Sequence, residues 1–217
     1  MPPCGVIDRL FRDRRCVARF DGSVHDLFPV AIDAEEGQAL RTWVVREKAL
    51  RTIEVGLGYG VAALFICDGL LANGDAAARH LAIDPHQQSR FANCALQFLD
   101  DAGVLELVEH HSAESHIVLP RLLAEGHAFD LAFVDGNHRF DGVFVDLVYL
   151  DRLVRCGGIV IVDDYQLRSV SRAVAFFTAN IGWAIEEVCT DAAAHHWAVL
   201  RTPRVRPLRA FDHFVDF

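Results

Sequence analysis

The sequence predicts an α/β protein with a mostly parallel β-sheet that ends in an antiparallel hairpin. From about residue 23 onward, short apolar runs alternate with stretches of helical periodicity. Val/Ile-rich runs such as residues 159–162 are typical of strands that are buried on both faces of a parallel sheet. The last two strand-like runs, residues 183–188 and 196–200, are separated by a segment that is too short for a parallel crossover, so we expect them to pair antiparallel.

Local signals set the order of the elements. Asp33 and Glu36 form a capping-box pattern that predicts the start of a helix. Asn73-Gly74, Gly103 and Gly157-Gly158 are stop signals for later helices. The expected strands are residues 52–55, 80–84, 105–109, 129–135 and 159–162, and the helices that follow them are residues 61–73, 87–101, 115–123, 140–154 and 170–178. Five strand–helix units therefore precede the hairpin.

Residues 52–61 form the most informative segment of the chain. A β-branched strand pattern runs into Glu54 and is followed by Gly56, Gly58 and Gly60, and then by the start of a helix. Glycines tolerate positive φ and let a ligand approach the backbone, and a helix N-terminus attracts anions, so the pattern favours a nucleotide-binding corner. Val61 stands where a dinucleotide-binding fingerprint has its last glycine. A tight turn without a ligand is the alternative interpretation.

Composition narrows the classes of function. The 217 residues carry a net charge of −9 and no long basic run, which argues against a nucleic-acid-binding surface. None of the six cysteines belongs to a Cys-x-x-Cys pair, which indicates buried thiols in a reducing compartment. No apolar run approaches the roughly 20 residues that cross a bilayer, and the N-terminus lacks a signal core. We therefore expect a cytoplasmic protein with no membrane or nucleic-acid partner.

Taken in order, the motifs resemble those of class I S-adenosylmethionine-dependent methyltransferases. They are Glu54-Val55-Gly56-Leu57-Gly58-Tyr59-Gly60, Ile83-Asp84-Pro85, residues 129–135 and residues 157–164, and the likeness covers roughly residues 32–201. The resemblance implies a Rossmann-like, seven-stranded, mostly parallel sheet with helices on both faces and a C-terminal antiparallel hairpin. It also implies an N-terminal segment or lid at residues 1–31, a methyltransferase domain at residues 32–202 and a C-terminal tail at residues 203–217.

Within this class, the chain is most similar to small metal-dependent O-methyltransferases of the catechol and caffeoyl-coenzyme A type. Glu36-Gly37-Gln38 matches the segment that closes over the cofactor in the catechol type. Val134-Asp135-Gly136-Asn137-His138, followed by residues 161–165, also resembles antibiotic sugar O-methyltransferases. Ala62 is a departure, because relatives often place a serine there to hold the methionine carboxylate. Backbone N–H groups at the start of the helix would then take that role.

The resemblance implies that the glycine corner binds S-adenosylmethionine. Glu54 would orient the glycine loop or contact the amino group of the cofactor. The other expected cofactor-binding residues are Gly56, Gly58, Tyr59, Gly60, Asp84, Ser115 and Asp135. The carboxylate of Asp84 would accept both ribose hydroxyls, and a helix N-cap is the alternative role for this residue. Ser112 and Ser115 compete for the adenine contact, and we prefer Ser115.

Three aspartates, Asp135, Asp163 and Asp164, follow neighbouring strands of the expected sheet. Carboxylates this close resist joint ionisation, and a divalent cation would relieve the repulsion. A set of oxygen ligands suits Mg²⁺, with Mn²⁺ or Ca²⁺ as alternatives. Neighbours on an extended strand face opposite ways, so Asp163 and Asp164 converge only if the strand has already turned. A metal-free site in which the aspartates cap helices or bind the cofactor is the other interpretation.

His138 is the expected catalytic base, with Asp135 as the second catalytic residue. It follows Asp135 by three positions, where metal-dependent relatives carry a lysine or histidine. With an unperturbed pKa of about 6.5, it would accept a proton from the acceptor hydroxyl near neutral pH. The expected function is S-adenosylmethionine-dependent methyl transfer to a hydroxyl of a small molecule, whether phenolic, catecholic or sugar.

Other functions and the role of the tail stay open at this point. The alternatives are a metal-independent methyltransferase in which Asp135 positions the acceptor, a nucleotide-dependent oxidoreductase, and a non-catalytic cofactor-binding module. Val61 and the terminal hairpin argue against the oxidoreductase. Phe211, Phe214 and Phe217 in the tail must pack on the body, on a lid or on a second subunit, and the last of these would make the protein a homodimer.

Overall fold

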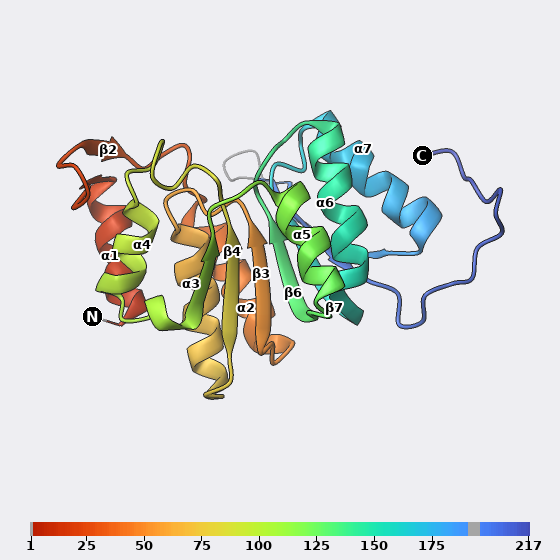
Figure 1. Ribbon diagram of the computed structural model, residues 1–217, viewed down its shortest axis with the longest axis horizontal. Coiled ribbons are helices and arrows are strands. Elements are labelled where there is room, and N and C mark those ends of the chain that lie inside the picture. Colours follow the sequence, from red (N-terminus) through yellow and green to blue (C-terminus); the bar gives the residue numbers. More distant parts are fainter. Residues whose placement is uncertain (1, 191–195) are drawn as a thin grey trace. The chain divides into compact units, whose positions relative to one another are not determined.

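The computed structural model describes residues 2–190 and 196–217, and the chain divides into two units, Met1–Glu114 and Ser115–Phe217 (Figure 1). The strands of its seven-stranded sheet have the order β5-β4-β3-β6-β7-β9-β8, and a separate two-stranded sheet joins β1 and β2. The pairings described below are parallel except at β8 and β9. The expected mostly parallel, seven-stranded sheet with a C-terminal antiparallel hairpin is therefore confirmed. In the described part of the chain, every helix is too short or too polar to cross a membrane.

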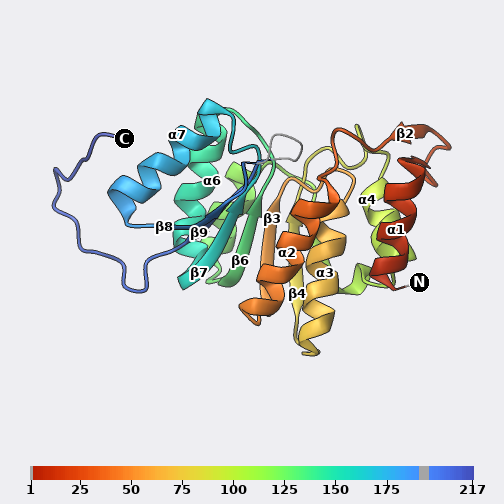
Figure 2. The ribbon, with the colours of Figure 1, turned by 180° about the vertical axis from the view of Figure 1, so that it is seen from behind.

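The first unit carries three parallel strands and the helices that connect them. Its elements are α1 (Pro3–Asp13), β1 (Arg15–Val17), β2 (Val24–Asp26), α2 (Ala34–Arg46), β3 (Arg51–Val55), α3 (Val61–Asn73), β4 (Arg79–Ile83), α4 (Cys94–Asp101), the 3-10 turn η1 (Leu105–Leu107) and β5 (Val108–His111). Val55 lies opposite Ile83, and Ile83 lies opposite His111, so the carboxyl ends of the three strands are level. Helices α2 and α3 pack side by side against this sheet, behind it in Figure 1 and in front of it in Figure 2.

The second unit carries the remaining strands. Its elements are α5 (Ser115–Ala124), β6 (Phe129–Val134), α6 (Phe140–Leu153), β7 (Val154–Val162), α7 (Arg168–Phe176), the π-helical turn η2 (Phe177–Ile181), β8 (Ala184–Val188) and β9 (Ala198–Arg201). Val134 of β6 lies opposite Val162 of β7 in parallel, so these two strands also end level. Strand β9 pairs antiparallel with β7 and β8, as the short connection predicts. Residues 191–195 of that connection lie outside the described residues.

Several helix ends follow the sequence signals. The side chain of Asp33 accepts a hydrogen bond from the backbone N–H of Glu36 at 2.8 Å and so caps α2. Gly74 ends α3 in the left-handed conformation. The core of each unit forms from the strands and the inner helix faces, with Ile53, Leu64 and Phe133 fully buried.

Three expected boundaries are wrong. Helix α4 begins at Cys94 rather than near residue 87, because Ala92 and Asn93 adopt positive φ and residues 85–93 form turns. The glycine pair at 157–158 does not close a helix, since α6 ends at Leu153 and β7 continues through both glycines. Residues 105–107 form a 3-10 turn, and β5 follows them.

The N-terminal segment is more ordered than its weak pattern indicates. Helix α1 begins after Pro2, where the fixed φ of proline suits a first helical turn, and it buries Val6, Ile7 and Leu10. The hairpin of β1 and β2, residues 15–26, follows directly. We call this segment the N-terminal hairpin below.

Candidate active site

The glycine corner lies between β3 and α3 in the first unit. Gly56, Gly58 and Gly60 have φ of 95°, 52° and 75°, a region that favours glycine. Gly60 is also held by packing, because a Cβ on it would lie 2.8 Å from the Cβ of Ala95 in α4. Among the residues that the structure describes, no side chain caps the N-terminus of α3, and the first turn of this helix carries no acidic residue. The N–H groups of Gly56, Gly58 and Gly60 are bonded within the protein, to Ile83, Asp84 and Leu57 respectively. The backbone N–H groups that suit an anionic or polar ligand are therefore those of the first turn of α3.

Asp84 holds the glycine corner from the end of the neighbouring strand. Its Oδ2 accepts hydrogen bonds from the backbone N–H of Gly58 at 2.8 Å and from Nε2 of Gln87 at 3.0 Å. Its Oδ1 accepts from the backbone N–H of His86 at 2.7 Å. Nε2 of Gln87 also donates to the carbonyl of Gly58 at 2.7 Å, so Asp84 and Gln87 together bind both polar groups of Gly58. Asp84 and Gln87 therefore form a bracket that fixes the glycine loop. Because residues 85–93 form turns and α4 begins only at Cys94, Asp84 does not cap a helix, and its contact with the ribose stays a prediction.

Gln87 is a residue that the sequence analysis did not single out. It is 1% exposed, and its Oε1 has no hydrogen-bond partner among the described residues. An unpartnered buried acceptor costs about 1–3 kcal/mol, so a donor on a ligand would be favoured beside it. Its position three residues after Asp84 and its polar side chain within a loop were the available signals. The residues around the glycine loop therefore fit a ligand that brings hydrogen-bond donors.

The other expected cofactor residues differ in exposure. Glu54 is fully buried, and its Oε1 lies 3.1 Å from Nε2 of His80, a buried histidine that bonds Thr52 through Nδ1 at 2.9 Å. Its carboxylate thus supports the strand ends from inside the core and presents no exposed oxygen. Tyr59 is 8% exposed, and its hydroxyl lies 3.3 Å from Nδ1 of His25. Ser115 is the half-buried first residue of α5 and belongs to the second unit.

In the second unit, the ends of β6 and β7 bring Asp135, His138 and Asp164 together. Nε2 of His138 lies 3.2 Å from Oδ1 of Asp135, and its Nδ1 lies 3.0 Å from Oδ2 of Asp164. One potential ligand atom from each of the three residues lies within 4.8 Å of the others, a spacing that a metal ion can bridge. Two carboxylates and an imidazole suit a divalent cation such as Mn²⁺ or Mg²⁺.

Asp163 takes a different place from its neighbour. It is 4% exposed, and its Oδ1 accepts a hydrogen bond from the backbone N–H of Asp164 at 2.6 Å. Strand β7 ends at Val162, and Asp164 has a φ of 53°, so the chain has already turned and Asp164 faces His138. Gln166 holds Oδ1 of Asp164 through its Nε2 at 2.7 Å. The set of three that forms includes His138, and Asp163 does not belong to it.

The expected pKa of about 6.5 for His138 is wrong. Hydrogen bonds to Asp135 and Asp164 raise the pKa of His138 to about 10, because both carboxylates favour the charged imidazolium and outweigh its partial burial. Burial raises the pKa of Asp135, against the effect of its hydrogen bond to His138. In the metal-free protein, His138 is therefore a cation at neutral pH that lies between two acidic side chains.

Comparison with known proteins identifies the family. The Methyltransferase domain family matches residues 53–165, which include the glycine corner, Asp84, and the cluster of Asp135, His138 and Asp164. The chain belongs to this methyltransferase family. No curated protein sequence matches it.

Solved structures of methyltransferases share the fold over most of the chain. The O-methyltransferase TomG from Streptomyces achromogenes, solved with S-adenosylmethionine, is 20% identical with a TM-score of 0.70 and covers 93% of this chain and 89% of its own. An O-methyltransferase from Bacillus cereus, solved with S-adenosylhomocysteine, is 13% identical with a TM-score of 0.72 and covers 92% and 90%. A putative O-methyltransferase from Klebsiella pneumoniae is 20% identical with a TM-score of 0.73 and covers 91% and 90%. At these identities the likeness establishes the methyltransferase fold.

Proposed function

We propose that this methyltransferase uses S-adenosylmethionine and transfers its methyl group to a hydroxyl of a small molecule. The glycine corner with its Asp84–Gln87 bracket is the observation that carries the proposal. Gly58 is fixed by two side chains, and Oε1 of Gln87 is a buried acceptor that no described residue bonds, so a ligand with hydroxyl donors would complete the site. Similar folds in TomG and the Bacillus cereus enzyme bind this cofactor or its demethylated product.

The roles of the chain's own residues follow from their positions. When bound, S-adenosylmethionine supplies a methyl group already activated on a sulfonium. The N-terminus of α3 holds its polar groups, and the glycines of the loop let it approach the backbone closely. Asp84 accepts three hydrogen bonds from the protein and keeps one acceptor site, on Oδ1, to offer a ribose hydroxyl. For the adenine contact, Ser115 is the residue that we propose.

We also propose that Asp135 and Asp164 hold a divalent cation beside His138. The donor set fits, because two carboxylates lie on either side of one imidazole and repel each other when His138 is neutral. Such a cation would supply Lewis acidity to an acceptor hydroxyl. His138, once it has lost its own proton, accepts the proton of that hydroxyl through a ring nitrogen. Asp163 supports this arrangement by fixing the backbone of Asp164.

The test combines cofactor binding with turnover on the full chain. Calorimetry with S-adenosylhomocysteine should show binding to wild type, and transfer of labelled methyl to a panel of phenolic, catecholic and sugar acceptors should identify the substrate class. His138→Ala should retain cofactor affinity and lose about 10²- to 10⁴-fold in turnover, the usual effect of removing a proton-transfer group. His116→Ala is the matched control, since His116 is an exposed histidine in α5.

Two outcomes would contradict these proposals. Failure of wild type to bind S-adenosylhomocysteine would refute the assignment of the cofactor. Full activity after dialysis against a chelator would refute the metal and favour an enzyme in which Asp135 positions the acceptor without a cation.

We further propose that the C-terminal tail mediates a homodimer. Phe217 packs on Phe176 of α7 with ring centroids 5.2 Å apart, and Asn180 exchanges two hydrogen bonds with the backbone of Val215, so the end of the tail is anchored. In contrast, Leu208 and Phe211, which precede this anchor in the chain, are fully exposed. Figure 1 shows the course of the C-terminal tail beyond β9. A second copy would cover Leu208 and Phe211, because exposed side chains of this size are a frequent mark of association. Sedimentation analysis should show a dimer that Leu208→Asp with Phe211→Asp dissociates, and a monomeric wild type would contradict it.

A further inference from the structure

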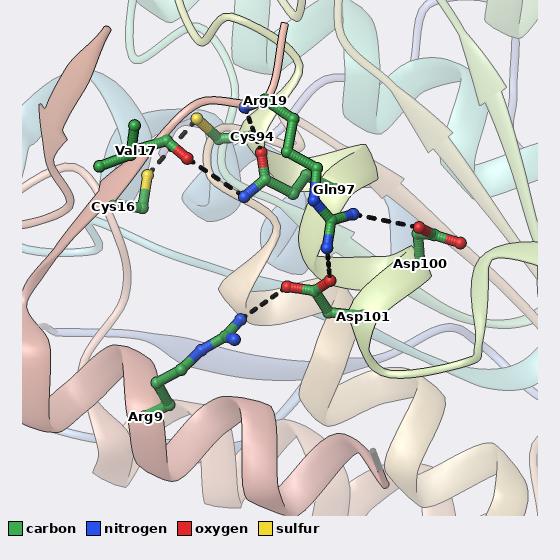
Figure 3. A network of polar contacts seen from close by, with 8 residues as sticks. All are labelled: Arg9, Cys16, Val17, Arg19, Cys94, Gln97, Asp100 and Asp101. Atoms are coloured by element: carbon green, nitrogen blue, oxygen red, sulfur yellow. Dashed lines mark hydrogen bonds and ion pairs between the residues drawn. The ribbon is translucent and has the colours of Figure 1, made fainter. Parts of the chain in front are cut away.

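Polar contacts fasten the N-terminal hairpin to α4 (Figure 3). The side chain of Gln97 bonds the hairpin twice: its Oε1 accepts from the backbone N–H of Arg19 at 2.7 Å, and its Nε2 donates to the carbonyl of Val17 at 3.2 Å. The guanidinium of Arg19 bonds Asp101, which also pairs with Arg9 of α1 at 2.7 Å. Most of these groups are exposed or half-buried, so each contact is individually weak and reversible.

The same hairpin also reaches the glycine corner. Nδ1 of His25 in β2 lies 3.3 Å from the hydroxyl of Tyr59, and their rings meet edge to face with centroids 5.9 Å apart. Nε2 of His25 is held by Oγ of Ser23 at 2.7 Å. Tyr59 in turn packs against Phe91 at 5.1 Å. Any movement of the hairpin away from α4 therefore disturbs the loop that binds the cofactor.

Two thiols meet within this contact. Sγ of Cys16 in β1 lies 3.5 Å from Sγ of Cys94, the first residue of α4. A disulfide requires an S–S distance of about 2.05 Å, so formation of the bond would bring the two sulfurs together by roughly 1.5 Å. Cys16 is half-buried and lines a cavity of about 400 Å³ together with Arg9, Arg15 and Arg19. Cys94 is fully buried behind it.

We propose that Cys16 and Cys94 are an oxidation site for hydrogen peroxide, whose disulfide clamps the N-terminal hairpin onto α4 and slows release of the cofactor. The effect on the cofactor rests on the proposed function, whereas the disulfide does not. A bond between residues 16 and 94 replaces a set of weak polar contacts with a covalent one, and thus raises the cost of opening the hairpin. The buried position of Cys94 protects it from direct attack, so the exposed side of Cys16 reacts first.

The chemistry balances in two steps. The thiolate of Cys16 attacks one peroxide oxygen, the O–O bond breaks, and Cys16 becomes a sulfenic acid while the second oxygen leaves as water after taking up a proton. The sulfur of Cys94 then attacks the sulfenic sulfur, the S–O bond breaks, and a second water leaves with the thiol proton. Two thiols are oxidised and one peroxide is reduced to two waters.

The ionisation of the two thiols determines the rate at which the disulfide forms. Burial raises the pKa of Cys94 to about 12 and also raises the pKa of Cys16, where the contact with Cys94 and the charge of Arg9 act in the opposite direction. The thiolate fraction near neutral pH is therefore small, and slow formation over a timed peroxide exposure is expected. Cys16 is expected to react with peroxide first, because the contact with Cys94 and the charge of Arg9 favour its thiolate, whereas Cys94 has no such compensation.

The experiment treats the full-length protein with peroxide and maps its peptides without reduction. We expect a linked pair of peptides that contain Cys16 and Cys94 and have lost two hydrogen atoms, together with a rise in the melting temperature of about 5–15 °C that dithiothreitol reverses. Release of S-adenosylhomocysteine, followed by stopped-flow displacement, should slow about tenfold, which corresponds to about 1.4 kcal/mol. Cys16→Ser and Cys94→Ala should abolish all three effects, and Cys4→Ser, which alters an exposed thiol in α1, should keep them.

The outcomes separate this proposal from the proposed function. Absence of the linked peptide in oxidised wild type would overturn the oxidation site. An unchanged release rate in protein that carries the disulfide would overturn the clamp. Failure of the reduced protein to bind S-adenosylhomocysteine would instead refute the cofactor assignment, while the peptide map and the melting temperature would still decide the disulfide. Formation of the Cys16–Cys94 link with oxidised glutathione, through a mixed disulfide, but not with peroxide would overturn the choice of oxidant.

Discussion

Substitution of Gly60 by alanine tests the architecture of the glycine corner, and the chain contains a matched control at the other end of the same helix. Gly60 precedes α3 with φ 75° and ψ 16°, and Gly74 follows it with φ 73° and ψ 15°. The backbone cost of alanine should therefore be the same at both positions. The surroundings differ, because a Cβ at Gly60 would lie 2.8 Å from the Cβ of Ala95, whereas one at Gly74 meets nothing within 4 Å.

The magnitudes follow from this difference. A left-handed conformation costs a non-glycine residue about 1–2 kcal/mol, so Gly74→Ala should lower the free energy of unfolding by that amount. Gly60→Ala adds an overpacking cost of about 1–3 kcal/mol, since neither the helix start nor α4 can retreat without disturbing the loop. The expected total for Gly60→Ala is about 2–5 kcal/mol. The loop distortion should also weaken binding of S-adenosylhomocysteine, an effect that Gly74→Ala lacks.

Urea unfolding followed by tryptophan fluorescence measures the stability term, with Trp43 in α2 as a buried reporter in the same unit. Calorimetry with S-adenosylhomocysteine measures the binding term. If the two variants lose stability equally, within about 0.5 kcal/mol, the close approach of Gly60 to α4 does not constrain this corner. If both also bind the cofactor product as wild type does, the glycine loop is not the binding site.

Three further predictions concern individual carboxylates and His138. Because the folded state raises the pKa of His138 from 6.5 to about 10, metal-free wild type should be more stable than His138→Gln below pH 6.5, and melting temperatures should converge as the pH rises toward 10. A constant difference from pH 6 to 10 would contradict the ion pairs. Glu54→Ala should cost about 1–3 kcal/mol in urea unfolding, since it leaves Nε2 of the buried His80 without its polar neighbour; no measurable loss of stability would show that this contact is dispensable. Asp84→Asn should weaken cofactor binding about tenfold. If Asp84 also bonds the ribose, the substitution should weaken the binding of a 2′-deoxy cofactor analogue by less than it weakens the binding of the cofactor itself. An equal loss with both ligands would restrict Asp84 to the loop.

Much of the fold was readable from local sequence signals. The cap at Asp33, the glycine that ends α3 and the short connection before β9 each depend on a few neighbouring residues, and each is confirmed. The N-terminal helix α1 was missed because its pattern is short and its burial depends on distant elements, α3 and α4. The late start of α4 was missed for a related reason. The turn at 85–93 is held by the side chains of Asp84 and Gln87, which bond Gly58 in the loop after β3. These partners lie 26 and 29 residues apart in the sequence, and no local pattern predicts that they meet.

The sequence predicted where the candidate site lies, but it did not predict the raised pKa of His138. The motif after β6 and the aspartates after β7 could be placed near each other because parallel strands end level, and Val134 does lie opposite Val162. The raised pKa of His138 could not be anticipated, since it requires that Asp164, 26 residues away, turn toward the imidazole. That turn depends on a positive φ at an aspartate and on the hydrogen bond that Asp163 accepts, both set by tertiary structure.

The acidic residues at the strand ends are of two kinds, which differ in whether their hydrogen-bond donors are backbone N–H groups or a side chain. Asp84 and Asp163 are almost fully buried and accept from backbone N–H groups of loops at the strand ends, Asp84 from the loop after its own strand and from the loop after β3, so their charge is used to build those loops. Asp135 and Asp164 remain partly exposed and face an imidazole whose proton can be replaced. A carboxylate fixed by backbone donors has little freedom to follow a reacting ligand, whereas one paired with a side chain does. Two neighbouring aspartates therefore have different roles. Asp163 holds the backbone of the loop, and Asp164 is a candidate metal ligand.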